Sequence, residues 1–261
     1  METLNKGQIA FVTGGGSGIG RAICKRFAQL GATVIAADIN EGAVAETVSM
    51  LENPVGDQVH EAVVLDVTNK SQVDKTMAYV KEKFGNIDIL MNNAGISAMH
   101  NFEDATEEEW DKLFNVNVKG MFLVTQAAVP MMKQKGGRII NTCSMAAVKP
   151  DPVMTPYTAT KYAVLGFTQS TALEFAKYNI TVNCISPGYI KTAMQAREVV
   201  WEGKIRGISP EQVFESYVSK TPMQRIGLPE DVADVVGLLV SPQAGFVTGT
   251  NVDITGGAHI A

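Results

Sequence analysis

Short apolar runs rich in valine and isoleucine alternate with longer amphipathic stretches along the chain, and this alternation restricts the fold more than any other feature. The seven runs are Ile9–Val12, Thr33–Ala37, Ala62–Leu65, Ile87–Met91, Arg138–Thr142, Thr181–Ile185 and Asn251–Ile254. Runs this short and apolar are typical of strands buried on both faces. Strands that alternate with helices pair in parallel through right-handed crossovers. The sequence therefore predicts an α/β fold with a doubly wound parallel sheet of about seven strands and helices on both faces.

The amphipathic stretches have the residue spacing of helices. They cover Gly18–Leu30, Ser71–Phe84 and Thr106–Lys133. In the last stretch, Thr106 followed by Glu109 matches a capping box, in which both side chains accept hydrogen bonds from backbone N–H groups at a helix start. We therefore expect a helix in each of these positions.

One segment interrupts the alternation. Between Pro187 and Pro229 there is no strand pattern, and two shorter helical patterns, Gln195–Arg206 and Pro210–Lys220, follow one another. An insertion of about forty residues in a compact domain is usually a functional lid. The sequence predicts a helical substrate lid at about residues 189–225.

Length and composition favour a single domain over residues 1–261. The chain has 46% hydrophobic and 19% charged residues, as ordinary soluble globular proteins do, and it is long enough to build a core without metal or disulfides. The formal net charge of −5 gives no reason to expect a nucleic acid or an anionic membrane as partner. No stretch approaches the ~18 apolar residues of a membrane span, and the polar N-terminal residues do not resemble a secretory signal.

The cysteines and histidines indicate a reducing compartment and no metal site. Cys24, Cys143 and Cys184 lie far apart in apolar runs, so we expect buried free thiols and a cytoplasmic location. The chain has three histidines, of which His100 is expected in a loop. Without a second histidine or an acidic cluster beside it, no metal is expected there.

A glycine-rich turn follows the first predicted strand and precedes the first predicted helix. It reads Thr13-Gly14-Gly15-Gly16-Ser17-Gly18-Ile19-Gly20. Without Cβ atoms a backbone turns sharply and approaches a phosphate closely, and amide N–H groups at the helix start attract the anion. The spacing departs from the G-x-G-x-x-G fingerprint, but the strand–turn–helix context is that of a Rossmann-type dinucleotide site. The expected cofactor contacts are Gly14, Ser17, Gly18, Ile19 and Gly20.

An acidic residue ends the second predicted strand. Asp38 comes eighteen residues after Gly20, close to the ~20 expected for the carboxylate that binds the adenosine ribose. A carboxylate there repels the 2′-phosphate of NADP, and Ser17 and Ile39 supply no cation at the neighbouring positions. Arg21, in the first turn of the helix, is a weaker candidate for binding that phosphate. The sequence therefore favours NAD, with Asp38 and Ile39 beside its ribose.

Three polar residues are the candidates for catalysis. Ser144 follows the fifth predicted strand, and thirteen residues later Tyr157 begins a pair with Lys161, one helical turn further on. Serine at the carboxyl end of a parallel strand borders the crevice where ligands bind. Tyrosine has a reference pKa of ~10, so it needs a neighbouring ammonium and the positive charge of NAD⁺ to act as a base near neutral pH. We expect Tyr157 to exchange the alcohol proton, Ser144 to hold the substrate oxygen and Lys161 to lower the pKa of Tyr157.

The order of these motifs resembles that of the short-chain dehydrogenase/reductase family from about Gly7 to Gly257. The matching positions are Thr13-Gly14-x-x-x-Gly18-x-Gly20, Leu65-Asp66-Val67, Asn92-Asn93-Ala94-Gly95, Asn117, Ser144, Tyr157, Lys161 and Pro187-Gly188. The resemblance implies an NAD(P)-dependent oxidoreductase that acts on a secondary alcohol or a ketone.

The resemblance also implies further cofactor contacts. Adenine would lie against Asp66 and Val67, and Lys161 would bind the nicotinamide ribose. The segment after the fourth strand, with Asn93, Ala94 and Gly95, would lie along the cofactor. The nicotinamide end would be lined by Pro187, Gly188, Ile190 and Thr192.

Two further implications concern proton transfer and assembly. Asn117 would hold a water that links Lys161 to solvent, whereas from the residues alone an interaction with the backbone is the simpler reading. Family members usually form homotetramers, here through the two long helices, about Thr106–Lys133 and Thr155–Lys177, and through the C-terminal strand region.

The substrate pocket is expected between the segments after the fourth, fifth and sixth strands. Candidate substrate contacts are Ser144, Met145, Asp151, Tyr157, Tyr189, Met194 and Trp201, with Met99 and Met154 close by. The lid sequence from Met194 to Glu202 resembles that of family members acting on polyols and ketoses. We therefore expect reversible NAD-dependent oxidation of a small sugar alcohol or vicinal diol to the ketose or acyloin.

Three alternatives remain open. A 3-oxoacyl-thioester (acyl-carrier-protein) reductase usually prefers NADPH, which Asp38 disfavours. A dehydrogenase of steroids or other bulky alcohols is the second alternative. The third is a non-catalytic NAD-binding sensor, but such proteins typically lose the tyrosine or the lysine, and here Tyr157 and Lys161 are both present.

Overall fold

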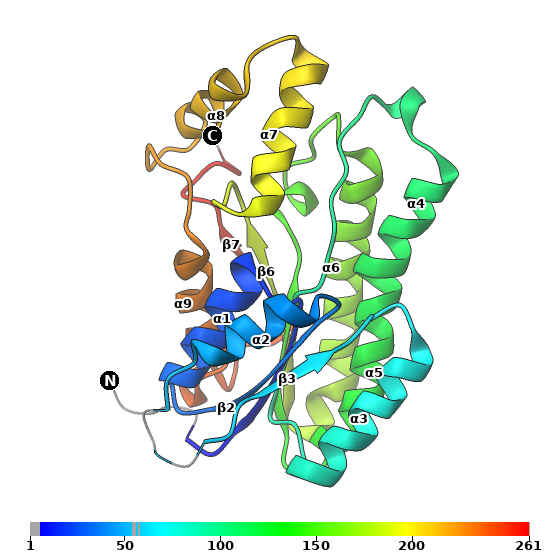
Figure 1. Ribbon diagram of the computed structural model, residues 1–261, viewed down its shortest axis with the longest axis vertical. Helices are drawn as coiled ribbons and strands as arrows, with labels where there is room; N and C mark the ends of the chain where they lie inside the picture. Colours follow the sequence, from blue (N-terminus) through cyan, green and yellow to red (C-terminus); the bar gives the residue numbers. More distant parts are fainter. Residues whose placement is uncertain (1–5, 54–55, 57, 261) are drawn as a thin grey trace.

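A computed structural model, which describes residues 6–53, 56 and 58–260, contains a seven-stranded sheet (Figure 1). The strands are β1 (Ile9–Thr13), β2 (Thr33–Asp38), β3 (Glu61–Val64), β4 (Ile89–Asn92), β5 (Gly137–Thr142), β6 (Ile180–Pro187) and β7 (Asn251–Ile254). They are all parallel, in the order β3-β2-β1-β4-β5-β6-β7. The strand order reverses between β1 and β4, and the carboxyl ends of strands at such a switch point border a ligand crevice. The predicted doubly wound α/β sheet is confirmed.

Helices cover both faces of this sheet. They are α1 (Gly18–Gln29), α2 (Glu41–Ser49), α3 (Lys70–Phe84), α4 (Glu107–Phe114), α5 (Met121–Met132), α6 (Thr155–Phe175), α7 (Ala193–Arg206), α8 (Pro210–Ser219) and α9 (Pro229–Leu239). Figure 1 shows α1 and α9 on one side of the strands and α3, α5 and α6 on the other. The short helix α2 and helix α9 were not among the helices expected from the sequence.

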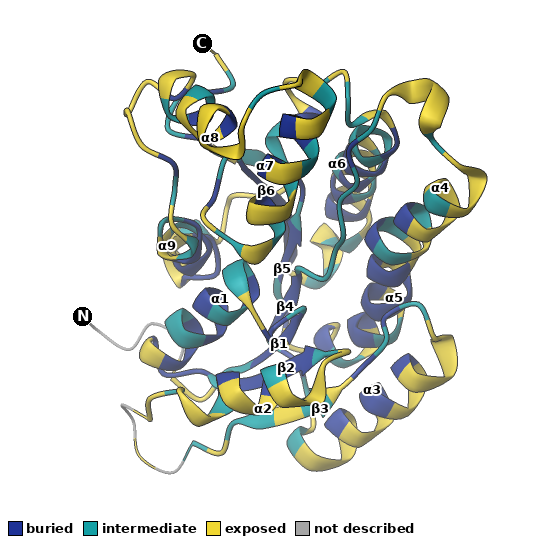
Figure 2. Ribbon diagram, turned by 45° about the horizontal axis from the view of Figure 1, so that its top comes forward, coloured by how far each residue is buried: buried dark blue, intermediate teal, exposed yellow. Residues whose placement is uncertain are grey.

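Each face of the sheet has its own apolar core. Phe27 of α1 and Val236 of α9 pack against β1 through Val12, while Val124 of α5 packs against the opposite face, where Phe11 points. Consecutive strand residues point to opposite faces, so a strand covered on both sides must be apolar at every position. Figure 2 accordingly shows the central strands and the sheet-facing sides of α1, α5 and α6 as buried.

The single helix expected over Thr106–Lys133 is divided into α4 and α5 by a π-helical segment, Asn115–Gly120. Such segments carry one extra residue per turn and often mark functional positions. Close packing explains the glycine at its end, because a Cβ atom on Gly120 would lie 2.6 Å from Cγ2 of Val67. The apolar periodicity of the sequence does not reveal this interruption.

The helices of the predicted lid, α7 and α8, lie over the carboxyl ends of the strands (Figure 1). A small apolar cluster of Val199, Val213, Tyr217 and Ile226 joins them. Within the described residues, no helix is long and apolar enough to cross a membrane. The three cysteines are free and buried, as expected. The first five residues, which carry the expectation about a secretory signal, lie outside the described part of the chain.

Candidate active site

A cavity of about 770 Å³ opens at the carboxyl ends of the strands and is closed on one side by the lid. Nineteen of the residues expected at the site line it: Gly14, Ser17, Gly18, Ile19, Asp38, Asn93, Ala94, Gly95, Ser144, Met145, Asp151, Tyr157, Lys161, Pro187, Gly188, Tyr189, Ile190, Thr192 and Met194. Six expected residues are not in its wall: Gly20, Ile39, Asp66, Val67, Asn117 and Trp201. The structure therefore brings the glycine turn, the Ser–Tyr–Lys group and the lid to one space.

Close backbone contacts explain the glycine turn between β1 and α1. Gly14 has a φ of +65°, and a Cβ atom there would lie 2.9 Å from Cα of Ala94. A Cβ atom on Gly20 would lie 2.0 Å from the carbonyl oxygen of Gly14, so Gly20 supports the turn from beneath instead of lining the cavity. Ser17 precedes α1 without a capping hydrogen bond from its side chain. The open turn and the uncapped amide N–H groups of the first helical turn fit the pyrophosphate of a dinucleotide.

The carboxylate of Asp38 connects the end of β2 with this turn. Its Oδ2 accepts a hydrogen bond from the amide of Gly16 at 3.0 Å, and its Oδ1 accepts one from the amide of Asn40 at 3.0 Å. Arg21 is held elsewhere, because its guanidinium donates to the carbonyl oxygen of Gly16 at 2.7 Å and pairs with Glu46 at 2.5 Å. Asp38 therefore lines the cavity while Arg21 does not.

Two threonines hold the segment after β4 in place. Thr13 Oγ1 accepts hydrogen bonds from the amides of Asn93 and Ala94 at 3.0 and 3.1 Å. The Asn93 side chain donates to the carbonyl oxygen of Gly14 at 3.2 Å and accepts from the hydroxyl of Thr142 at 3.3 Å. These bonds link the carboxyl ends of β1, β4 and β5 behind the cavity.

Three of the residues expected near the adenosine do not line the cavity. Ile39 is 69% exposed. Asp66 accepts hydrogen bonds from the amide and hydroxyl of Thr68 through Oδ1, at 2.9 and 2.7 Å. Val67 packs against Gly120. The contacts of Asp66 and Val67 with adenine, and of Ile39 with the ribose, stay predictions.

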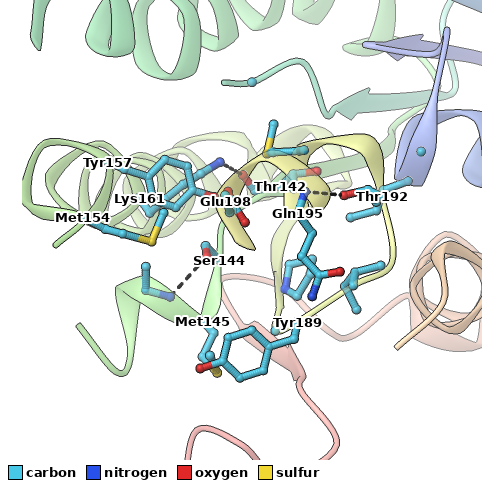
Figure 3. A pocket seen from close by; sticks show the side chains of 18 of the residues that line it. Thr142, Ser144, Met145, Met154, Tyr157, Lys161, Tyr189, Thr192, Gln195 and Glu198 are labelled. Carbon is cyan, nitrogen blue, oxygen red and sulfur yellow. Dashed lines mark hydrogen bonds between the residues drawn. The ribbon is translucent and has the colours of Figure 1, made fainter. Parts of the chain in front are cut away.

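Ser144, Tyr157 and Lys161 point into one part of the cavity (Figure 3). Tyr157 and Lys161 project from the first two turns of α6, with Lys161 Nζ 5.4 Å from the centre of the Tyr157 ring. Lys161 Nζ also donates to the carbonyl oxygen of Thr142 at 2.9 Å. Ser144 follows β5 and accepts a hydrogen bond from the amide of Ala146 at 3.1 Å, which leaves its hydroxyl hydrogen free to donate.

The protein groups around Tyr157 raise its pKa. Burial raises it above the ordinary value, the nearby carboxylate of Glu198 raises it further, and a hydrogen bond with Ser144 lowers it. Burial also lowers the pKa of Lys161. Removal from water thus opposes both charged forms, the phenolate of Tyr157 and the ammonium of Lys161.

Asn117 lies in the π-helical segment and uses its side chain on protein partners. Its Oδ1 accepts from the amide of Ile96 at 2.8 Å, while its Nδ2 donates to the carbonyl oxygen of Ile96 at 2.9 Å and to Thr160 Oγ1 at 3.1 Å. A Cβ atom on Gly95 would lie 3.3 Å from Asn117 Oδ1 and 3.8 Å from Lys161 Nζ. Asn117 thus stands beside Lys161 and fixes the segment after β4, which agrees with the simpler reading of its sequence position.

The lid contributes several polar residues that the sequence analysis did not single out. Gln195, Arg197 and Glu198 of α7 line the cavity, as do Tyr217 and Lys220 at the α8 end of the lid. Helical spacing could have indicated Glu198, because it lies four residues after Met194 and so shares its face of α7. Trp201 follows two turns after Met194, about 10 Å further along the helix axis, which places it beyond the cavity.

Comparison with known proteins agrees with this geometry. The model of the short chain dehydrogenase family matches residues 8–203. A 3-oxoacyl-(acyl-carrier-protein) reductase FabG of Thermotoga maritima is 40% identical over 98% of this chain and 99% of its own length. An L-2,3-butanediol dehydrogenase of Corynebacterium glutamicum is 37% identical over 96% and 98%.

The similarity extends to three-dimensional structure. An NAD⁺-bound xylitol dehydrogenase superposes with a TM-score of 0.90 at 35% identity and covers 97% of this chain and 99% of its own. The matched segment contains the glycine turn, Ser144, Tyr157 and Lys161, which the structure gathers around one cavity. The chain therefore belongs to the short-chain dehydrogenase/reductase family of oxidoreductases.

Proposed function

We propose that this oxidoreductase uses NAD to interconvert a secondary alcohol of a small polyol or vicinal diol and the corresponding ketose or acyloin. The observation that carries the proposal is the convergence of Ser144, Tyr157 and Lys161 on a cavity whose lid wall holds polar side chains. Relatives named for 2,3-butanediol and xylitol support the substrate class. We propose one NAD-binding domain over residues 1–261, with residues 189–225 as its substrate lid.

Tyr157 exchanges a proton with the substrate oxygen, while the hydroxyl of Ser144 donates a hydrogen bond that holds this oxygen in place. The nicotinamide cofactor, when bound, supplies the hydride acceptor or donor and a positive charge beside the phenol. Because burial and Glu198 raise the pKa of Tyr157 in the protein alone, proton transfer requires compensating positive charge in the cavity. Lys161 stabilises the phenolate through space and binds the nicotinamide ribose. The relay water that the family resemblance implies would lie beside Asn117, whose side chain itself is bonded to Ile96 and Thr160.

Asp38 carries the proposed preference for NAD. Its carboxylate borders the cavity next to the glycine turn and would repel a 2′-phosphate. Arg21, the nearby cation, is engaged by Glu46 and the turn backbone. The cavity is also lined by four lysines and arginines, which all follow β5 in the chain and lie outside the glycine turn and the end of β2. They are Lys149, Lys161, Arg197 and Lys220.

A second candidate is reduction of a 3-oxoacyl thioester, which the 40% identity to the Thermotoga maritima reductase favours. The same three catalytic residues would serve that reaction in the reverse direction. Its substrate lacks a hydroxyl on the neighbouring carbon, so the two candidates differ in what the lid must recognise.

The test is a panel of sorbitol, galactitol, xylitol, 2,3-butanediol and 2-butanol, and of acetoacetyl thioester in the reducing direction, each with both cofactors. We expect the highest kcat/KM for a polyol or diol with NAD⁺, read from nicotinamide absorbance. Tyr157→Phe is expected to lower kcat by about 10²–10⁴-fold, the usual contribution of a general acid–base group. A loss of kcat of only a few-fold in Tyr157→Phe would contradict the role of Tyr157. A preference for NADP⁺ would contradict the role of Asp38, and a dominant activity on the thioester would contradict the substrate class.

We further propose a homotetramer in the cytoplasm. Its interfaces would be the long helices α4–α5 and α6 and the C-terminal strand region, where the apolar side chains of Phe122, Leu173 and Phe246 are exposed. The three free, buried thiols are consistent with a reducing compartment.

A further inference from the structure

A carboxylate on the lid faces the catalytic tyrosine across the cavity. Glu198, on α7, is half-buried and lines the cavity together with Tyr157 (Figure 3). It is close enough for its charge to raise the pKa of Tyr157. No lysine, arginine or histidine of the described residues forms an ion pair with Glu198. Glu198 therefore borders the cavity without an ion-pair contact among the described residues, and Arg197 acts on its charge only from a distance.

The surroundings of Glu198 leave its carboxylate short of donors. Burial raises its pKa, the Ser97 hydroxyl and the charge of Arg197 lower it, and the carboxylates of Glu202 and Asp151 raise it. Ser97 lies beside Glu198, but its buried Oγ makes no hydrogen bond of good geometry. A partly desolvated carboxylate without matched donors is costly, and a ligand that donates to it relieves this cost.

Gln195, one turn earlier on the same helix, has a side-chain donor that also lacks a hydrogen-bond partner. Its side chain is 6% exposed, lines the cavity, and its buried Nε2 has no hydrogen-bond partner. The α7 wall thus offers an acceptor at Glu198, while the donor nitrogen of Gln195 lies buried behind the cavity surface. A hydroxyl group both donates and accepts, whereas a carboxylate only accepts and would be repelled by Glu198, and an alkyl group satisfies neither residue.

We propose that Glu198 determines substrate specificity by accepting a hydrogen bond from the hydroxyl next to the reacting carbon, so that α7 selects vicinal diols and polyols. This inference rests on the proposed function and deepens it. Because Tyr157 and Glu198 face the same space, one small substrate can present neighbouring oxygens to both.

The test compares 2,3-butanediol or xylitol with 2-butanol, which lacks the second hydroxyl. Glu198→Leu removes the acceptor, and Glu198→Gln keeps one acceptor oxygen but no charge. A hydrogen bond to a charged group contributes enough for Glu198→Leu to lower kcat/KM for the diol by about 10–100-fold, mainly through KM. The value for 2-butanol, measured on the pH-independent plateau, is expected to change less than about threefold, with Glu198→Gln between Leu and wild type for the diol.

Glu215→Gln is the matched control, since it removes an exposed carboxylate from α8 of the same lid. A second measurement avoids turnover by using the Tyr157→Phe protein loaded with NAD⁺. In this background, adding Glu198→Leu is expected to weaken the binding of xylitol measured by calorimetry. The affinity of the same two proteins for NADH is expected to be equal. If Glu198→Leu lowered kcat/KM equally for the diol and for 2-butanol, or lowered neither, the proposed role of Glu198 would be wrong. The proposed function would still stand as long as the wild type oxidised the diol. A wild type inactive on every diol and polyol would overturn both.

Discussion

Burial and the charge of Glu198 both raise the pKa of Tyr157, and only the hydrogen bond from Ser144 opposes them. Tyr157 is desolvated, faces the carboxylate of Glu198 and receives a stabilising hydrogen bond from Ser144. Lys161 stands beside it on α6, and the thiol of Cys143 is close enough for a charge there to raise the pKa of Tyr157 as well. A phenol in this setting holds its proton to higher pH than a solvated one.

This raised pKa predicts an alkaline preference for alcohol oxidation. Only the deprotonated Tyr157 accepts the alcohol proton, so kcat/KM for oxidation should rise with pH as Tyr157 titrates, while ketone reduction, which needs the phenol, should fall over the same range. Glu198→Gln removes a charge that raises this pKa and should shift both limbs to lower pH. Profiles with 2-butanol and its ketone, from pH 6 to the highest pH at which the protein stays folded, check this. Unmoved limbs, or limbs moved to higher pH, would show that Glu198 does not act on Tyr157.

Single residues were predictable where their chemistry is tied to a local motif. The glycine turn, Asp38, Ser144, Tyr157 and Lys161 all reach the cavity because each follows a strand or starts a helix at the carboxyl edge of the sheet. Trp201, which was expected at the cavity, is not among the residues that line it, and Glu198, which lines it, was not singled out. The angle at which α7 crosses the sheet decides which of its turns meets the cavity. That angle depends on packing between α7 and α8, which the periodicity of one helix does not encode.

The lid is held together by a polar network as well as by its apolar cluster. The hydroxyl of Tyr217 donates to Glu202 at 2.5 Å, and Arg206 pairs with the same carboxylate at 2.6 Å. The ring of Tyr217 stacks on Tyr189 with 4.0 Å between centres. Tyr189 and Tyr217 both line the cavity, so the contacts of this network connect α8 with the cavity wall.

Tyr217→Phe keeps the stacked ring and deletes one hydrogen bond of this network. Leaving the buried Glu202 with fewer donors costs about 1–3 kcal/mol. Because the change lies within the lid, we expect KM for the best alcohol to rise several-fold with a small change in Tm, and hydrogen exchange to increase at α7 and α8. Tyr79→Phe, which breaks a surface Tyr–Glu bond of 2.6 Å away from the lid, is the control and should leave KM unchanged. A large loss of Tm with unchanged KM would show that the network stabilises the whole fold and not the lid.

Elements were predictable where apolar periodicity is continuous. The strands agree with their expected positions within a few residues, and α1, α3, α7 and α8 likewise, because each buries a regular face. The π-helical segment Asn115–Gly120 was missed, since it depends on contact between Gly120 and Val67 and on the bonds that Asn117 makes with Ile96. Those partners lie about twenty to fifty residues away in the sequence, beyond the range of a local pattern.

The outer surface of the molecule carries apolar side chains that the fold itself does not bury. Leu173 of α6 is 84% exposed, Phe246 before β7 is fully exposed, and Leu238 of α9 is 65% exposed. They lie on or next to the elements through which we propose that four copies assemble. Single exposed apolar residues are common on monomeric proteins, so the number of such residues does not show that an interface exists. A substitution at one of them, compared with a control substitution elsewhere on the surface, tests for the interface.

Leu173→Glu tests whether α6 forms an interface. In a two-fold interface each side chain occurs twice, so one substitution removes two apolar contacts, each of about 1.5–3 kcal/mol if fully buried, and introduces two carboxylates. We expect wild-type protein to be tetrameric by gel filtration with light scattering, and Leu173→Glu to form smaller species at micromolar concentration. Val59→Glu, at a 63% exposed residue in the loop before β3, is the control and should remain tetrameric. An unchanged mass for Leu173→Glu would exclude this face of α6 from the interface, since two unpaired carboxylates at its centre cannot be accommodated without loss of affinity.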